Sequence, residues 1–183
     1  SVNVLWEDVE FAIGAPDPTA DAVEVRVIGL VPDQIVTMHL IDSVPVRDGQ
    51  AVADVERDIL KLAVLERHHA TGNVGLGFVR GLGLLRGALA GSVGHDAHNL
   101  TVAGCDDVSM MTAARAVGRL GGGLVAALDD QVVAQVPLPI GGLMSDQSLM
   151  AVREQMDGLV RAARDLGSGL HDPLMTLGFL ALE

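Results

Sequence analysis

A short polar segment interrupts the apolar middle of this chain and limits how the chain can fold. Residues 91–99 read Gly-Ser-Val-Gly-His-Asp-Ala-His-Asn, so two imidazoles, a carboxylate, an amide and a hydroxyl lie between two apolar, glycine-rich stretches. Burying such groups without partners costs free energy. The glycines before the histidines and the β-branched residues after them favour a loop between two strands. Such a loop can aim both histidine rings at one point.

This polar loop has two interpretations. In the functional one, Asp96 fixes the tautomer of a histidine while the other ring, or Asn99, meets a ligand or a metal. In the structural one, the loop is a polar plug whose side chains bond the backbone of their own turn. The functional interpretation is favoured, since polar clusters in clefts are more often sites than plugs. Ser92 lacks the G-x-S-x-G elbow of a nucleophile, which favours a hydrogen-bonding role for it.

Apolar periodicity predicts two principal amphipathic helices. One covers about 148–166, where an apolar stripe recurs at alternating spacings of three and four, and Gly167 follows in the position of a left-handed cap. The stripe consists of Leu149, Val152, Met156, Leu159, Ala163 and Leu166. The other covers about 107–120, with Asp106 and Asp107 at its start and glycines 121–123 at its end.

Short β-rich runs predict a mixed β-sheet. The sheet is expected to be largely aliphatic, because aromatic residues make up only 2% of the chain. The strand candidates are residues 23–27, 35–41, 59–65, 88–93, 100–103, 124–128 and 131–136. Hairpin turns are expected at 48–49 and 129–130, and a compact turn region is expected between residue 75 and the strand at 88–93. The strand–helix–strand run 100–128 predicts one parallel crossover. The predicted fold class is α/β (mixed α+β), a single domain at 23–183 after an irregular lead-in segment or linker at 1–22.

Charge and composition exclude several classes of function. A formal net charge of −12 repels phosphate backbones, and the few aromatic residues offer little for base stacking, so no nucleic-acid partner is expected. Cys105 is the single cysteine, which excludes an internal disulfide and fits a reducing cytosol. No apolar run reaches the roughly 18 residues of a membrane helix, and no signal peptide is visible. We expect a cytoplasmic protein without a membrane partner.

Four other features favour structural roles or stay open. The glycine heptads 75–81 and 81–87 approach a dinucleotide fingerprint, but the third glycine comes one residue late, so phosphate binding is rejected. Residues 66–69, Glu-Arg-His-His, lack further metal ligands at set spacing and are interpreted as an Arg–Glu pair at a strand end. Cys105 is interpreted as a packed small residue. The loop 137–146 can equally wall a pocket or connect two elements.

Six segments, in order, resemble the C-terminal domain of bacterial adenine deaminase, in the amidohydrolase superfamily. They are Glu66-Arg67-His68 with Thr71-Gly72-Asn73, then residues 75–81, 92–99, 121–124, 137–146 and 172–177. The order is specific, and the resemblance runs from about Val23 to the last residue. The chain departs from the family at Gly91, Gly94 and Ala97, where Ser, Ala and Ser are usual.

The resemblance implies a hydrolase that acts on a cyclic amidine C–N bond, converting adenine to hypoxanthine and ammonia in purine salvage and catabolism. Such chemistry uses a divalent metal, manganese or iron, to lower the pKa of bound water, together with groups that move protons. In the superfamily most metal ligands lie on a (β/α)8 barrel that begins with a His-x-His pair. None of the six histidines here forms such a pair, so we expect the metal mostly outside this chain and little activity from the chain alone.

The resemblance further implies that this chain completes the active site of a barrel-bearing enzyme. The candidate catalytic residues, which handle protons or orient ligands, are His95, Asp96 and His98. The candidate substrate-binding residues are Ser92, Asn99 and His68, and no metal ligand is assigned. The expected partners are adenine, the barrel domain and further copies in a homo-oligomer. The alternative is a non-catalytic structural or oligomerisation module, in which the polar loop is only a buried plug.

Overall fold

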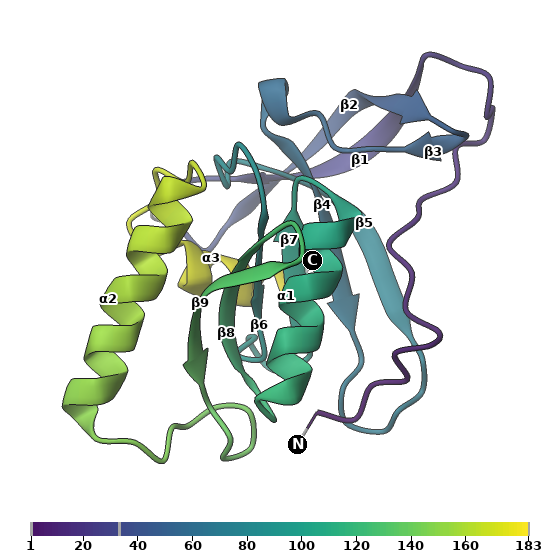
Figure 1. Ribbon diagram of the computed structural model, residues 1–183. Coiled ribbons are helices and arrows are strands. Elements are labelled where there is room, and N and C mark those ends of the chain that lie inside the picture. The colour runs from purple at the N-terminus through teal and green to yellow at the C-terminus, as the bar shows by residue number, and fades with distance from the viewer. Residues whose placement is uncertain (1, 33, 183) are drawn as a thin grey trace.

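The computed structural model describes residues 2–32 and 34–182, which form a single mixed α/β domain. A nine-stranded mixed sheet with the order β3-β2-β1-β5-β4-β7-β6-β8-β9 carries α1 on one face and α2 and α3 on the other (Figure 1). The strands are β1 Ala22–Leu30, β2 Thr37–Arg47, β3 Gln50–Ala51, β4 Ile59–Leu65, β5 Val74–Arg80, β6 Ala88–Gly91, β7 Leu100–Gly104, β8 Gly123–Leu128 and β9 Gln131–Pro137. The helices are α1 Asp107–Arg119, α2 Leu149–Asp165 and α3 Pro173–Phe179, with 3-10 turns at Val55–Arg57 and Leu180–Leu182.

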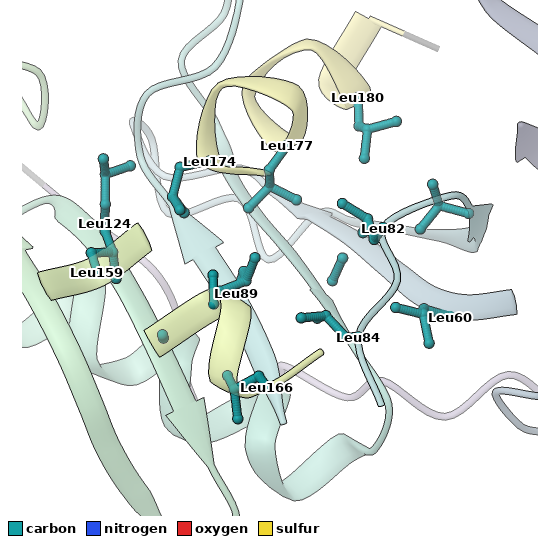
Figure 2. Close-up of a cluster of buried hydrophobic side chains, with 14 of the residues drawn as sticks. Leu60, Leu82, Leu84, Leu89, Leu124, Leu159, Leu166, Leu174, Leu177 and Leu180 are labelled. Carbon is teal, nitrogen blue, oxygen red and sulfur yellow. The ribbon is translucent and has the colours of Figure 1, made fainter. Parts of the chain in front are cut away.

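The central strands are buried on both faces, which explains why they read as nearly continuous apolar runs. In β6, Leu89 points into a leucine-rich core shared with α2 and α3 (Figure 2). Ala88 and Ala90 point to the opposite face, into a second core shared with α1. Alternation of large and small residues therefore lets helices pack on both sides of one short strand.

Both predicted helices are confirmed, and each begins at a capping side chain. The Asp106 side chain accepts a hydrogen bond from Ser109 N at 2.7 Å at the start of α1. The Ser148 side chain accepts from Ala151 N at the start of α2, and Gly167 follows that helix with a φ of 121°. None of the helices among residues 2–32 and 34–182 is long and apolar enough to cross a membrane.

The predicted parallel crossover is also confirmed. β7 and β8 both pair antiparallel with β6, so they are parallel to each other, and α1 connects them across the sheet. The predicted hairpin turn at Asp48 and Gly49 joins β2 to β3, where both residues adopt positive φ. The sheet is mixed because β1 pairs parallel with β5, whereas its other pairs are antiparallel.

Two expectations from the sequence were incomplete. Residues 75–80 were expected in a turn region, but they belong to β5, and only residues 81–87 form the turn. The glycines of β5 leave it without a side-chain alternation, and its strand character comes from pairing with β1 and β4 on its two edges. The short helix α3 was not predicted, although Asp172 as N-cap and Pro173 at the first helical position are a known start signal.

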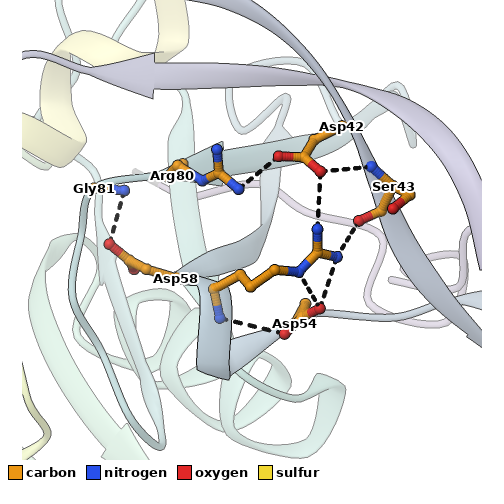
Figure 3. A network of polar contacts seen from close by, with 7 residues as sticks. Asp42, Ser43, Asp54, Asp58, Arg80 and Gly81 are labelled. Carbon is orange, nitrogen blue, oxygen red and sulfur yellow. Dashed lines mark hydrogen bonds and ion pairs between the residues drawn. The ribbon is translucent and has the colours of Figure 1, made fainter.

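A polar network stabilises the end of the sheet where β4 begins and β5 ends (Figure 3). Asp42 binds Arg80 at 2.6 Å and Arg57 at 2.9 Å. The Asp58 carboxylate accepts hydrogen bonds from Gly81 N and Gly83 N, which fixes the 81–87 turn to the start of β4. Burial raises the pKa of Asp58 despite these two donors. The opposite end of the sheet carries the polar loop singled out above.

Residues 2–21 contain no long regular element, yet they pack on the domain. Val9 and Phe11 are buried in the core on the α1 side of the sheet. Asn3 donates from its backbone N to Arg67 O at 2.8 Å and from Nδ2 to His68 O at 3.1 Å. Asn3 is therefore bound at the same end of the sheet as the polar loop.

Candidate functional site

Several connections meet at one end of the sheet because the neighbouring strands there run antiparallel. Leu65, at the end of β4, pairs with Leu100 at the start of β7, and Gly91, at the end of β6, pairs with Leu124 in β8. This pairing places the 66–73 segment, the 92–99 loop and the beginning of β8 side by side. The loop that follows β9 joins them there through hydrogen bonds.

Ser92 fastens the 92–99 loop to two of these neighbours. Its side chain is fully buried, and its Oγ accepts from Gly123 N at 2.8 Å and donates to Gly142 O at 2.6 Å. The hydroxyl thus satisfies a donor at the start of β8 and an acceptor in the loop after β9. These bonds support the hydrogen-bonding role expected of Ser92, within the domain.

Arg67 also binds the 92–99 loop and the loop after β9, and it is only 1% exposed. Its guanidinium donates to the carbonyl oxygens of His98, Ser92 and Gly141, the last at 3.1 Å. Burial lowers the pKa of Arg67. Sequence reasoning missed this role, for which the only signal was the place of Arg67 in a segment shared with the adenine deaminase family.

Glu66 and Arg67 bind different partners, so the expected Arg–Glu pair at the strand end is wrong. Successive side chains of an extended segment point to opposite sides, which separates the two. The Glu66 carboxylate accepts from the backbone N–H groups of His68, His69 and Thr71 and from the Thr71 hydroxyl. Desolvation would raise the pKa of Glu66, but these donors outweigh it and lower the pKa to about 2.

His68 is exposed and contacts the 92–99 loop from outside. Its Nε2 lies 2.8 Å from Ala97 O, and because a carbonyl oxygen only accepts, this nitrogen carries the hydrogen. The neutral ring is then left with Nδ1 as an acceptor. His68 therefore supports the outer side of the loop, near the first residues of the chain.

His95 and Asp96 form a pair at the tip of the loop. His95 Nδ1 lies 3.1 Å from Asp96 Oδ1, and the two side chains are 53% and 78% exposed. The carboxylate favours the tautomer with hydrogen on Nδ1, which leaves Nε2 of the neutral ring free to accept a proton. The ring is stacked on Phe179 of α3 at a centroid distance of 5.6 Å and an interplanar angle of 22°. The His95 ring thus contacts the Asp96 carboxylate at its edge and the Phe179 ring at its face.

His98 and Asn99 lie deeper than His95. Both are half-buried, and His98 Nδ1 and Asn99 Oδ1 are buried without a hydrogen-bond partner in the part of the chain that the structure describes. Native structures satisfy nearly all buried polar atoms, so such exceptions call for a reason. Asp96 and His98 also adopt left-handed backbone conformations, with φ of 58° and 50°. Strained residues of this kind cluster at binding and active sites.

His95 and His98 line one pocket of about 330 Å³, a size that suits small-molecule binding. The rest of its wall is mainly apolar and comes from the loop, β8, α2 and α3: Val93, Gly94, Leu124, Met156, Asp172, Leu174, Met175, Gly178 and Phe179. Asp96 contacts the pocket only through His95, whereas Ser92, Asn99 and His68 are not part of its wall. The contribution of α3, including Asp172 and Phe179, was not foreseen from the sequence.

His95, His98 and Asp172 line the pocket, but they do not converge on one point as metal ligands would. Across residues 2–32 and 34–182, no three His, Cys, Asp or Glu side chains lie close enough together to hold a metal ion. The residues present therefore do not fit the divalent metal that the family resemblance implies. Cys105 is no alternative nucleophile, because burial, with Asp106 and Asp58 nearby, raises the pKa of its thiol to about 12.

Together these features define a mixed α/β domain with a histidine-lined pocket at one end of its sheet. Residues 34–183 match the family model of the adenine deaminase C-terminal domain, and the chain belongs to this family.

Similar proteins agree with this assignment. The chain is 49% identical over 182 residues to an adenine deaminase of Desulfatibacillum aliphaticivorans, which covers 100% of this chain and 31% of that protein. It is 54% identical over 158 residues to an adenine deaminase of Oleidesulfovibrio alaskensis, covering 86% of this chain and 28% of that protein. Adenine deaminase 2 of Carboxydothermus hydrogenoformans is 52% identical with the same coverage. The chain thus spans less than a third of the length of these curated relatives.

Proposed function

We propose that this chain is the C-terminal domain of an adenine deaminase and completes an active site whose metal centre lies on polypeptide that precedes it. The observation that carries this proposal is the placement of two imidazoles of one loop, His95 and His98, on the wall of a small-molecule-sized pocket. Family membership supports adenine as the substrate. Manganese or iron is the proposed metal, held outside the residues of this chain.

The loop residues have separate roles in this proposal. Deamination requires protons to reach a ring nitrogen and the departing amine. His95 moves such a proton at Nε2, and Asp96 acts as a positioning residue because it holds Nδ1 at 3.1 Å. His98 lines the pocket and contacts the substrate there, while Asn99 and His68 provide polar contacts when the loop faces the rest of the enzyme.

The wider setting is proposed on the same basis. The barrel domain of the longer protein is the partner of this domain, and the complete enzyme is a homo-oligomer. The single cysteine fits a reducing compartment, which supports action in the cytoplasm. Alone, this chain is proposed to have little or no turnover, because its described residues hold no cluster of metal ligands.

A chimeric enzyme tests the proposal directly. The matched 182 residues of the Desulfatibacillum aliphaticivorans adenine deaminase are replaced by this chain, and adenine turnover is measured with added manganese or iron(II). In the chimera, His95→Gln should lower kcat about 10²-fold or more, and Asp96→Asn about 10- to 100-fold with a shifted pH profile. Thermal stability should change little, since both side chains are more than half exposed.

Asp130→Asn is the matched control, because Asp130 is exposed in the turn between β8 and β9, at the opposite end of the sheet. Its kinetics should equal those of the parent chimera. Parent kinetics in both His95→Gln and Asp96→Asn would refute the roles given to the loop. That result would favour the alternative of a structural module.

A further inference from the structure

The apolar stripe of α2 extends beyond the domain that it packs against. Leu159, Ala163 and Leu166 are buried against the sheet, whereas Val152 and Met156 are only half-buried. Leu149, at the start of the same stripe, is 83% exposed. A helix rises 1.5 Å per residue, so about 15 Å separates the covered Leu159 from the uncovered Leu149. Among the described residues, the stripe is therefore partly covered at Val152 and Met156 and left uncovered at Leu149.

This uncovered stripe is continuous with the wall of the histidine-lined pocket. Met156 lines that pocket together with Val93 of the loop and with Met175 and Phe179 of α3. Met175 is 62% exposed and Val93 is 38% exposed. We call this surface the α2–α3 face and define it by Leu149, Met156, Met175, Phe179 and Val93. Contiguous apolar surface of this kind marks interaction sites.

The path of the chain indicates what covers this face. The relatives are more than three times as long as the matched segment, and a C-terminal domain follows the rest of its chain. Asn3 is hydrogen-bonded to the carbonyl oxygens of Arg67 and His68. His68 in turn contacts the 92–99 loop at Ala97 O. Polypeptide that precedes the domain therefore arrives beside this loop, at the end of the sheet where α2 begins, although residues 2–6 themselves pack on the α1 side (Figure 1).

We propose that the α2–α3 face docks against the polypeptide that precedes this domain in the longer enzyme, and that docking closes the pocket over His95 and His98. This inference rests on the proposed function and adds the surface through which it operates. Met175 supplies an apolar contact at the pocket, and Leu149 supplies one at the start of α2. The closed pocket then excludes water from the imidazoles, which strengthens every polar interaction inside it.

Methionine oxidation in the chimera described above tests this inference. The chimera is treated briefly with hydrogen peroxide, and oxidation of each methionine is measured by mass spectrometry, relative to the same protein in guanidinium. Met175 should be oxidised at least several-fold more slowly in the folded chimera than when unfolded. Met150, which is 70% exposed and outside the apolar stripe, and Met38, which is 48% exposed, should remain reactive.

Two matched variants identify the face itself. Leu149→Asp should weaken docking and restore oxidation of Met175. Leu85→Asp places the same charge at a side chain that is 69% exposed near the opposite end of the sheet, and it should leave Met175 protected. Circular dichroism of both variants checks that the domain remains folded.

The outcomes separate this inference from the proposed function. An active chimera in which Met175 reacts as fast as Met150 overturns the docking face and leaves the proposed function intact. An inactive chimera in which Met175 is protected overturns the proposed activity and supports the docking. Protection that disappears when the chimera is diluted to monomers means that a second copy covers the face, which overturns the proposed occupant.

Discussion

Arg67 donates a hydrogen bond from Nη2 to the carbonyl oxygen of Gly141, 74 positions further along the chain, over 3.1 Å. The same guanidinium donates to the carbonyl oxygens of Ser92 and His98, near the two ends of the polar loop. One buried side chain therefore holds both ends of the loop and the connection that follows β9. The shape of the histidine-lined pocket depends on this residue, although Arg67 is not part of its wall.

We first predict that Arg67→Met lowers the free energy of unfolding by on the order of 3 kcal/mol, because it leaves buried carbonyl oxygens without their donor. Arg67→Lys should recover only part of this loss, since an ammonium group lacks the planar fork of a guanidinium. Urea unfolding of the 183-residue chain measures both. Arg153→Met, at a side chain that is 73% exposed, should stay within about 0.5 kcal/mol of the parent. Equal stability of all three variants would contradict this role of Arg67.

The second prediction compares alanine substitutions at two adjacent glycines, one of which serves as the control for the other. Gly141 and Gly142 both have positive φ, but a Cβ at Gly142 would lie 2.7 Å from Arg67 Nη1, whereas one at Gly141 meets nothing within 4 Å. Gly141→Ala should cost only the backbone strain, about 1–2 kcal/mol. Gly142→Ala should cost about 1–3 kcal/mol more, because Arg67 is displaced. Equal unfolding midpoints for the two variants would show that the Arg67 guanidinium can move without lowering the stability of the protein.

The third prediction concerns acid unfolding and Glu66. Its pKa is about 2 in the folded chain against an ordinary value of 4.5. A lowered pKa in the folded state stabilises the protein above the unfolded value, and the contribution is lost as pH falls from about 4.5 to about 2. Glu66→Gln should therefore be less stable than the parent at neutral pH, and the difference should narrow through this window. Urea unfolding at a series of pH values measures it.

Glu154→Gln is the control for this pH series, because Glu154 is an exposed carboxylate of α2 for which the structure shows no hydrogen bond. Its stability should follow that of the parent at every pH. The difference in free energy of unfolding between Glu66→Gln and the parent should not stay constant from neutral pH to about pH 2. A constant difference would contradict the proposed hydrogen-bonded carboxylate.

The fourth prediction is that two neighbouring histidines have opposite tautomers. Asp96 places the hydrogen of neutral His95 on Nδ1, whereas the contact with Ala97 O places that of His68 on Nε2. Nitrogen-15 chemical shifts of the imidazoles distinguish the two forms. Asp96→Asn should reduce the Nδ1-protonated form of His95 and leave His68 unchanged. Identical His95 shifts in the parent and the variant would remove the basis for a positioning role of Asp96.

The elements that the sequence predicted are those specified by local pattern. The stripe of α2 and the Asp106 cap of α1 lie within one segment each, so neighbouring residues suffice to reveal them. β5 was missed because its glycines carry no alternating side chains, and its strand character depends on partners elsewhere in the sequence. α3 has seven residues, which is too short for apolar periodicity to emerge.

The candidate site divides in the same way. His95, Asp96 and His98 are close in sequence, and their grouping could be anticipated from the loop alone. The role of Arg67 could not be, because its partners at 92, 98 and 141 come together only when β4, β6 and β7 pair and the loop after β9 folds beside them. Which end of which strand meets which loop is a property of the whole sheet.

The tethering of the loop has one more consequence, for how the pocket discriminates among ligands. Its histidine wall is fixed in position, because Ser92 and Arg67 bind the loop to three other segments. The wall also includes Met156 and Met175, whose unbranched thioether chains adapt to irregular shapes. The pocket should therefore select strictly for the hydrogen-bonding groups of a ligand that face the imidazoles. It should tolerate added bulk more readily in substituents that point toward the sulfur atoms.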